Sequence, residues 1–187
     1  NKRFSDPIRV SYSNVEFADK VDDIKHNLVR EALKLVGIDK GVEIVYMSDL
    51  LPVQEGSGLG ASSSILVGTL NALHAYKGEH ASAKRLAEEA CKIEIDILKE
   101  PIGKQDQYSA AYGGFNYVEF NPDGSVFINP IIFNKKVKEE LNKNLMLFYT
   151  GICMRSEIVL AEQQKNTYEN VGTIDRMVEL SKEILES

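Results

Sequence analysis

The chain has 187 residues, of which 43% are hydrophobic, so it can bury the core of one sizeable domain or two small ones. Its formal net charge of -6 is mixed along the chain without a basic stripe, which argues against a nucleic-acid partner. No apolar run approaches the roughly 20 residues that span a bilayer, and two cysteines are too few for a disulfide framework. We therefore expect a cytoplasmic protein with a small-molecule ligand and no membrane partner.

The first part of the chain shows alternating strand and helix patterns. Apolar and polar residues alternate over 8–17, which predicts one half-buried strand. Asp22 and Asp23 can cap a helix whose apolar residues recur at helical spacing until Gly37. The β-branched run 42–48 predicts a second strand that leads into a glycine-rich loop.

The middle of the chain predicts three helices and a hairpin. Residues 61–76 are small and apolar nearly all round, which indicates a buried helix. A second helix is expected over 82–99, before Pro101, and a short one over 105–112. The turn sequence 121–124, Asn-Pro-Asp-Gly, lies between two β-rich runs and predicts an antiparallel hairpin.

The last third predicts a charged helix over 135–141, an apolar strand over 145–150, and helices over 156–165 and 173–186. Strands and helices are interspersed without the regular alternation of a doubly wound parallel sheet. The pattern therefore favours an α+β fold.

The segment from Pro52 to Ser64, PVQEGSGLGASSS, is the sharpest local signal in the chain. Glycines allow a close backbone approach to an anion, and the first turn of a helix presents free N–H groups with partial positive charge. The spacing G-x-G-x-G without a following Gly-Lys-Ser/Thr is neither a P-loop nor a dinucleotide fingerprint. From the glycines alone, a tight turn with a capping serine and a phosphate site are equally compatible with the pattern.

Two motifs in order resemble those of the GHMP kinases. Pro52 followed by GLGASS at 58–63 resembles their P-x-x-x-G-L-G-S-S phosphate loop, with Ala61 in place of the first serine. The string GKQDQ at 103–107 resembles the G-x-x-D-Q segment of galactokinase-like members. Its continuation through Phe120 looks most like the heptose-phosphate kinases, which the segment 150–163 also resembles.

The resemblance implies an α+β fold with a GHMP-kinase-like N-terminal domain, ribosomal protein S5 domain 2-like. We assign 1–134 to this ATP-binding domain, incomplete at its start, and 135–187 to the truncated beginning of a C-terminal α+β domain. Neither the family's N-terminal substrate motif nor its C-terminal glycine-rich motif is present. We therefore expect a fragment of a longer family member.

The resemblance also implies an activity, a sugar-phosphate kinase that transfers the γ-phosphoryl group of ATP to a hydroxyl, the anomeric one, of a heptose 7-phosphate. It places Asp106 at the catalytic position, and Ser62 and Glu94 at the Mg²⁺ position. Lys104, Gln105, Gln107 and Arg155 would contact the substrate. The residues it places around the phosphates of ATP are Gly56, Gly58, Leu59, Gly60, Ala61, Ser62 and Ser63.

Several alternatives stay open. The acceptor could be that of a galactokinase- or fucokinase-like enzyme, and a nucleotide- or sugar-phosphate-binding module without turnover fits the same motifs. Glu94 could belong to a solvated helix face, with Asp96 as the rival carboxylate, and Asp106 could be an acid favoured by a helix dipole. A homo-oligomer is compatible with the sequence. The three histidines lack the spacing of a zinc site or a catalytic triad, so we interpret them as structural or exposed.

Overall fold

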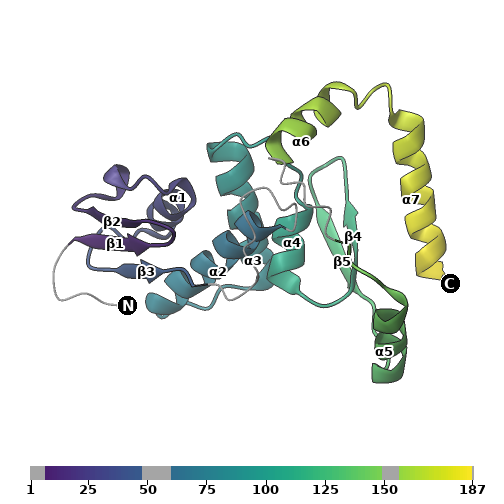
Figure 1. The fold of residues 1–187 in the computed structure, drawn as a ribbon, viewed down its shortest axis with the longest axis horizontal. Helices are drawn as coiled ribbons and strands as arrows, with labels where there is room; N and C mark the ends of the chain where they lie inside the picture. Colours follow the sequence, from purple (N-terminus) through teal and green to yellow (C-terminus); the bar gives the residue numbers. More distant parts are fainter. Residues whose placement is uncertain (1–6, 48–59, 149–155, 187) are drawn as a thin grey trace.

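The computed structural model describes residues 7–47, 60–148 and 156–186 (Figure 1). Five strands and a larger number of helical segments in these ranges confirm the α+β fold class. In chain order the elements are β1 (Ile8–Ser11), β2 (Val15–Ala18), η1 (Val21–Asp23), α1 (Asn27–Val36), β3 (Glu43–Val45), α2 (Ala61–Tyr76), α3 (Ala83–Cys91), η2 (Lys92–Ile97), α4 (Gln105–Tyr112), β4 (Asn116–Phe120), β5 (Val126–Pro130), α5 (Lys135–Asn144), α6 (Ser156–Lys165) and α7 (Val171–Glu186).

A three-stranded sheet in the order β2-β1-β3 forms one end of the molecule (Figure 1). β1 pairs antiparallel with β2 and parallel with β3, with Val10 opposite Glu16 and Ile44. The prediction of one strand over 8–17 is therefore wrong. The chain reverses after Tyr12, whose N–H donates to the carbonyl of Asn14 at 2.8 Å, because the polar residues at this point suit a turn as well as a strand.

Helix α1 begins later than the sequence predicted. Asp22 and Asp23 lie in the short 3-10 segment η1, and the cap of α1 is His26, whose Nδ1 accepts the N–H of Val29 at 3.4 Å. Asp22 instead forms an ion pair with Lys34 at 2.7 Å. The predicted end is confirmed, because Gly37 adopts the left-handed conformation with φ 73°.

The main core lies between the sheet and the helices α1, α2 and α3, and it continues into η2. Ile8 of β1, Leu33 of α1, Leu70 of α2 and Ile93 of η2 are all fully buried. Each such side chain stabilises the fold by about 1.5–3 kcal/mol relative to exposure. The apolar helix predicted over 61–76 is confirmed with the same bounds, and this core fixes its position.

The predicted helix over 82–99 divides into two segments. Ser82 caps α3 through its Oγ, which accepts the N–H of Arg85 at 3.2 Å. The chain then winds as a π-helix in η2, in which Ile93 and Glu94 are buried. Wider winding of this kind occurs often at functional sites. The segment ends at Ile97, and Lys99 beyond it has φ 59°.

Helix α4 and the hairpin β4–β5 match their predictions. The turn contains Gly124 with φ 85°, and the strands pair antiparallel with Val118 opposite Ile128. Tyr108 of α4 packs edge-on against Phe120 of β4, with ring centroids 5.9 Å apart. This contact attaches the hairpin to the helical part of the domain.

The remaining helices lie outward from the hairpin, and α7 is at the end farthest from the three-stranded sheet (Figure 1). The charged helix α5 extends to Asn144, three residues beyond its predicted end. Residues 145–148 form no strand, contrary to the prediction, and Leu147 is 89% exposed. An apolar run becomes a strand only where another strand pairs with it, and these four residues have no such pairing. No helix in the described ranges combines the length and the apolar character needed to cross a membrane.

Candidate functional site

The start of α2 presents backbone donors that the helix itself leaves without a partner. Gly60 precedes the helix in the left-handed conformation, with φ 67°, and no side chain caps the first turn. The first intrahelical bond joins the N–H of Ser64 to the carbonyl of Gly60, at 3.0 Å. The N–H groups of Ala61, Ser62 and Ser63 therefore have no partner within the helix and lie at the positive end of its dipole, where an anion is stabilised.

Glu94 of η2 contacts this first turn from the interior of the domain. It is 2% exposed, and its Oε2 accepts a hydrogen bond from Ser63 Oγ at 2.8 Å. The alternative that Glu94 belongs to a solvated helix face is therefore wrong, and the rival carboxylate of Asp96 is exposed. The same Oε2 accepts from Gln107 Nε2 of α4 at 2.5 Å. One carboxylate thus joins η2 to the beginnings of α2 and α4.

Asp106, in the first turn of α4, lies against the glycine that precedes α2. A Cβ built on Gly60 would be 3.2 Å from both Cγ and Oδ2 of Asp106. The Asp106 side chain is exposed, so it is accessible to a ligand held at the start of α2. The structure therefore brings Asp106, Glu94 and the Gly60–Ser63 turn together, although 31 residues separate Ser63 from Glu94 and 13 separate Glu94 from Gln107.

The donor set around Glu94 fits a hard divalent cation. A buried carboxylate is unfavourable unless positive charge compensates it, and its partners in the described part of the chain are two neutral donors without an ion pair. The described residues contain no group of three or more His, Cys, Asp or Glu side chains that would form a complete cage. A cation that retains water and binds mainly through a ligand's phosphates needs only one or two protein oxygens.

The other predicted contacts divide into four groups. Lys104 and Gln105 are exposed beside Asp106, where a ligand can reach them. Gln107 is fully buried against Glu94, which differs from the predicted contact with sugar hydroxyls. Ser62, predicted as a metal ligand, is exposed, and it is Ser63 that contacts Glu94. The remaining predictions, Gly56, Gly58, Leu59 and Arg155, lie outside the described residues.

Two ionisable groups behind the site stay neutral at pH 7. Burial raises the pKa of the Cys91 thiol to about 11, with Lys104 lowering it and Glu94 raising it to smaller extents. Burial also raises the pKa of the Tyr108 hydroxyl. Tyr108 and Tyr112 stack with ring centroids 6.3 Å apart, as packing residues would. Cys91 is therefore unsuited to act as a nucleophile.

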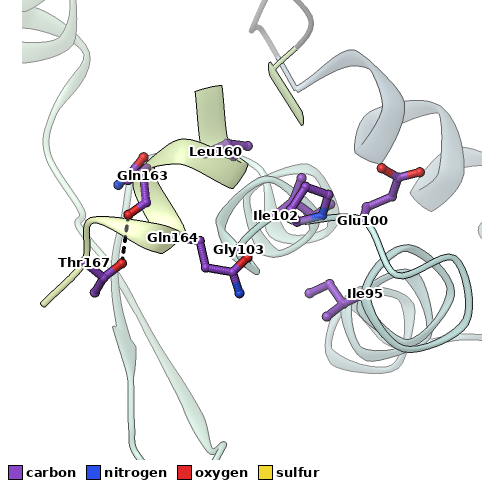
Figure 2. Close-up of a pocket in the computed structure, with 9 residues that line it drawn as sticks. Ile95, Glu100, Ile102, Gly103, Leu160, Gln163, Gln164 and Thr167 are labelled. Carbon is purple, nitrogen blue, oxygen red and sulfur yellow. Dashed lines mark hydrogen bonds between the residues drawn. The ribbon is translucent and has the colours of Figure 1, made fainter. Parts of the chain in front are cut away.

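A cavity of about 290 Å³ adjoins the chain segment that leads into α4 (Figure 2). Ile95 and Gly103 line one side, and Leu160 and Gln164 of α6 line the other. Thr167 completes this side with its hydroxyl donating to the carbonyl of Gln163 at 3.0 Å (Figure 2). The residues that line it include the carboxylate of Glu100 but no lysine or arginine. Its chemistry suits uncharged polar groups better than a phosphate.

Replacing Gly60 by alanine should disturb the site and the fold together. The added Cβ meets Asp106, and a non-glycine residue in the left-handed region costs roughly 1–2 kcal/mol. We expect the free energy of unfolding, measured by urea titration, to fall by about that amount.

Gly68→Ala is the matched control, since Gly68 lies within α2 and a Cβ there meets nothing within 4 Å. Alanine at that position should raise stability by about 0.5–1 kcal/mol through helix propensity. Equal effects of the two substitutions would contradict the tight contact between Gly60 and Asp106.

Residues 27–114 match the family model described as the GHMP kinases N terminal domain. This match covers every residue of the described site. The chain therefore contains a GHMP kinase N-terminal domain, which confirms the family and the fold that the two motifs predicted.

Individual similar proteins include two kinases named for heptose phosphates and a mevalonate kinase. The chain is 31% identical over 125 residues to D-glycero-alpha-D-manno-heptose 7-phosphate kinase of Campylobacter jejuni, which covers 67% of this chain and 37% of that protein. It is 29% identical over 168 residues to mevalonate kinase of Thermococcus sibiricus, covering 84% and 46%. The crystal structure of a D-glycero-D-manno-heptose 1-phosphate kinase from Bacteroides thetaiotaomicron superposes with a TM-score of 0.68 at 26% identity, covering 75% and 49%. The chain thus spans less than half the length of these three relatives.

Proposed function

We propose that this chain is the ATP-binding part of a sugar-phosphate kinase. One observation carries the proposal. The exposed carboxylate of Asp106 lies against Gly60, at the start of a helix whose first-turn N–H groups have no partner within the helix, and the buried carboxylate of Glu94 contacts the same turn. An anion site, a cation ligand and an accessible acid or base in one place are the components that phosphoryl transfer needs.

The start of α2 would bind the phosphates of ATP through the N–H groups of residues 61–63, with Gly56, Gly58, Leu59 and Gly60 completing the loop. The Mg²⁺ of Mg·ATP would be held by Glu94 together with Ser62 or Ser63, and it would neutralise charge on the β- and γ-phosphates. We assign 1–134 to the ATP-binding domain and 135–187 to the beginning of a second domain. This boundary and a cytoplasmic location stay predictions.

In the proposed reaction the oxygen of an acceptor hydroxyl attacks the γ-phosphorus as the bond from that phosphorus to the β–γ bridging oxygen breaks. ADP leaves with the electron pair of that bond, and the hydroxyl proton passes to Asp106. Because phosphoryl transfer has a loose transition state, Asp106 contributes by orienting the hydroxyl as well as by accepting its proton.

The acceptor we favour is a heptose 7-phosphate, phosphorylated at its anomeric hydroxyl. The support comes from two relatives, at 31% and 26% identity, whose names specify kinases of heptose phosphates. Lys104 and Arg155 would bind the acceptor phosphate, with Gln105 at its hydroxyls. The mevalonate kinase relative favours a second candidate, a kinase that acts on another small hydroxyl compound, so galactose, fucose and mevalonate belong in the same test.

The experiment incubates the full chain with Mg·ATP and each acceptor, and follows ADP release together with the phosphorylated product by mass spectrometry. We expect a bisphosphate from heptose 7-phosphate and much slower turnover of the sugar without its phosphate. Preference for an unphosphorylated acceptor would favour the second candidate function, a kinase that acts on another small hydroxyl compound. Binding of Mg·ATP without turnover of any acceptor would indicate a binding module.

A further inference from the structure

Gln107 makes the closest contact in the site, and its amide orientation is dictated by its neighbour. Its side chain is fully buried, and Nε2 lies 2.5 Å from Glu94 Oε2. The reverse orientation would set an amide oxygen against a carboxylate oxygen, and neither atom carries a proton to donate. Nε2 must therefore face Glu94.

Both donors to Glu94 converge on a single oxygen. Ser63 Oγ and Gln107 Nε2 donate to Oε2, and neither of these bonds uses Oε1. The two donors come from different helices, α2 and α4, so they fix the carboxylate from two directions. The arrangement holds one oxygen and leaves the other for a ligand.

The amide oxygen of Gln107 lacks a hydrogen-bond partner among the described residues. Oε1 is buried, and no described residue donates a hydrogen bond to it. Buried polar atoms in native structures nearly always have a partner, and an exception calls for a bound water, ion or ligand. Mg²⁺ retains several waters when bound to proteins, and each of them is a hydrogen-bond donor.

We propose that Gln107 is a positioning residue for the cation of the nucleotide complex. Its Nε2 holds Oε2 of Glu94 so that Oε1 is presented to Mg²⁺, and its own Oε1 accepts a hydrogen bond from water that enters with the metal. The proposal rests on the proposed function. It replaces the sugar contact predicted for Gln107 with a role behind the metal ligand.

This role also links the two halves of the site. Gln107 directly follows Asp106, the proposed base, and Ser63 directly follows Ser62, a proposed phosphate contact. The Glu94 carboxylate connects the two segments because it accepts hydrogen bonds from both Gln107 and Ser63. Loss of the Gln107 contact would free both Glu94 and the first turn of α4. The effect should therefore appear in metal-dependent binding of nucleotide.

The test compares the full chain with its Gln107→Met variant, which keeps the length of the side chain but removes both polar atoms. Calorimetry measures the affinity for AMP-PNP, a non-hydrolysable ATP analogue, in MgCl₂ and in EDTA. In the variant we expect the affinity gained on adding Mg²⁺ to fall by about 10- to 100-fold, as for other groups that support a metal ligand. Affinity in EDTA should be unchanged. Should Gln107→Met fail to fold, Gln107→Leu removes the same two polar atoms with a shorter side chain and should reduce the same gain.

Tyr46→Phe is the matched control, since it removes another partly buried hydrogen bond, between the Tyr46 hydroxyl and Thr69 Oγ1 at 2.7 Å, that does not involve Glu94. It should leave the Mg²⁺-dependent gain intact. An equal gain in wild type and Gln107→Met would overturn the positioning role, as would an equal loss in Tyr46→Phe. A wild-type affinity that is indifferent to Mg²⁺ would instead overturn the metal role of Glu94 and, with it, the proposed function.

Discussion

Replacing Asp106 by asparagine should lower kcat by about 10²- to 10⁴-fold, the usual contribution of a positioned acid or base. Asparagine keeps the size and much of the hydrogen-bonding capacity of the side chain, but it cannot accept the proton of the acceptor hydroxyl. The side chain is exposed and lies against Gly60, so the substitution should leave the fold unchanged. Steady-state kinetics with saturating Mg·ATP measure the effect on kcat.

Asp96→Asn provides the control because Asp96 is an exposed carboxylate on η2, close to Glu94 in sequence. It should retain wild-type kcat. If Asp106 only complements the dipole of α4, its asparagine variant would instead lose about 0.3–1 kcal/mol of stability and keep its rate. Unchanged turnover in Asp106→Asn would remove this residue from the mechanism.

Elements with clear end signals could be predicted from the sequence. Helix α2 matched its predicted bounds because Gly60 and Gly78, both with positive φ, mark its two ends. Helix α4 likewise ends at Gly113, with φ 60°. The hairpin was predictable from the turn around Gly124. In each case a local conformational requirement is visible as a residue type.

The errors arose where the local pattern was compatible with two structures. The alternation over 8–17 continues through the turn that separates β1 from β2, so periodicity alone did not reveal the reversal. In η2 the letters KIEIDI resemble a charged helix surface, but Glu94 lies on the face that continues from the buried Ala90 and Cys91 of α3. Whether that face is buried depends on packing against other elements.

The site was predictable as a set of motifs but not as a set of contacts. Family resemblance indicated Glu94 and Asp106, whereas the bonds from Ser63 and Gln107 to Glu94 join residues that are distant in sequence. Ser62 and Ser63 are adjacent identical residues, and only the helical direction of α2 decides which of them faces inward. The structure therefore adds the contact of Ser63 with Glu94 and the burial of Gln107.

Replacing Glu94 by glutamine should abolish most activity without lowering stability in metal-free buffer. A buried carboxylate with only neutral donors is unfavourable until a cation compensates its charge. Glutamine has nearly the same volume, and its amide oxygen can still accept from Ser63 and Gln107. We expect a melting temperature equal to or above that of wild type in EDTA, together with a loss of at least about 100-fold in kcat/KM, the pattern of a functional group that opposes stability.

The contrast with Glu94→Ala separates charge from packing. Alanine leaves a cavity and deprives the hydroxyl of Ser63 and the amide of Gln107 of their acceptor, so the free energy of unfolding should fall by roughly 2–5 kcal/mol. Both variants lose the proposed cation ligand, but only alanine should lose the fold's stability. Equal destabilisation by glutamine and alanine would mean that the charge itself contributes to folding, contrary to this argument.

Addition of Mg·ATP completes the test, because a ligand that binds only the folded state raises stability by about 2.7 kcal/mol at 100 times its Kd. Wild type should therefore gain thermal stability on adding Mg·ATP, whereas Glu94→Gln should gain no more than it does from ATP in EDTA. The variant would then be the more stable protein without ligand and the less stable one with it. This reversal in the order of the two melting temperatures would identify Glu94 as a residue whose charge serves the cation, since no purely structural role of this carboxylate produces it.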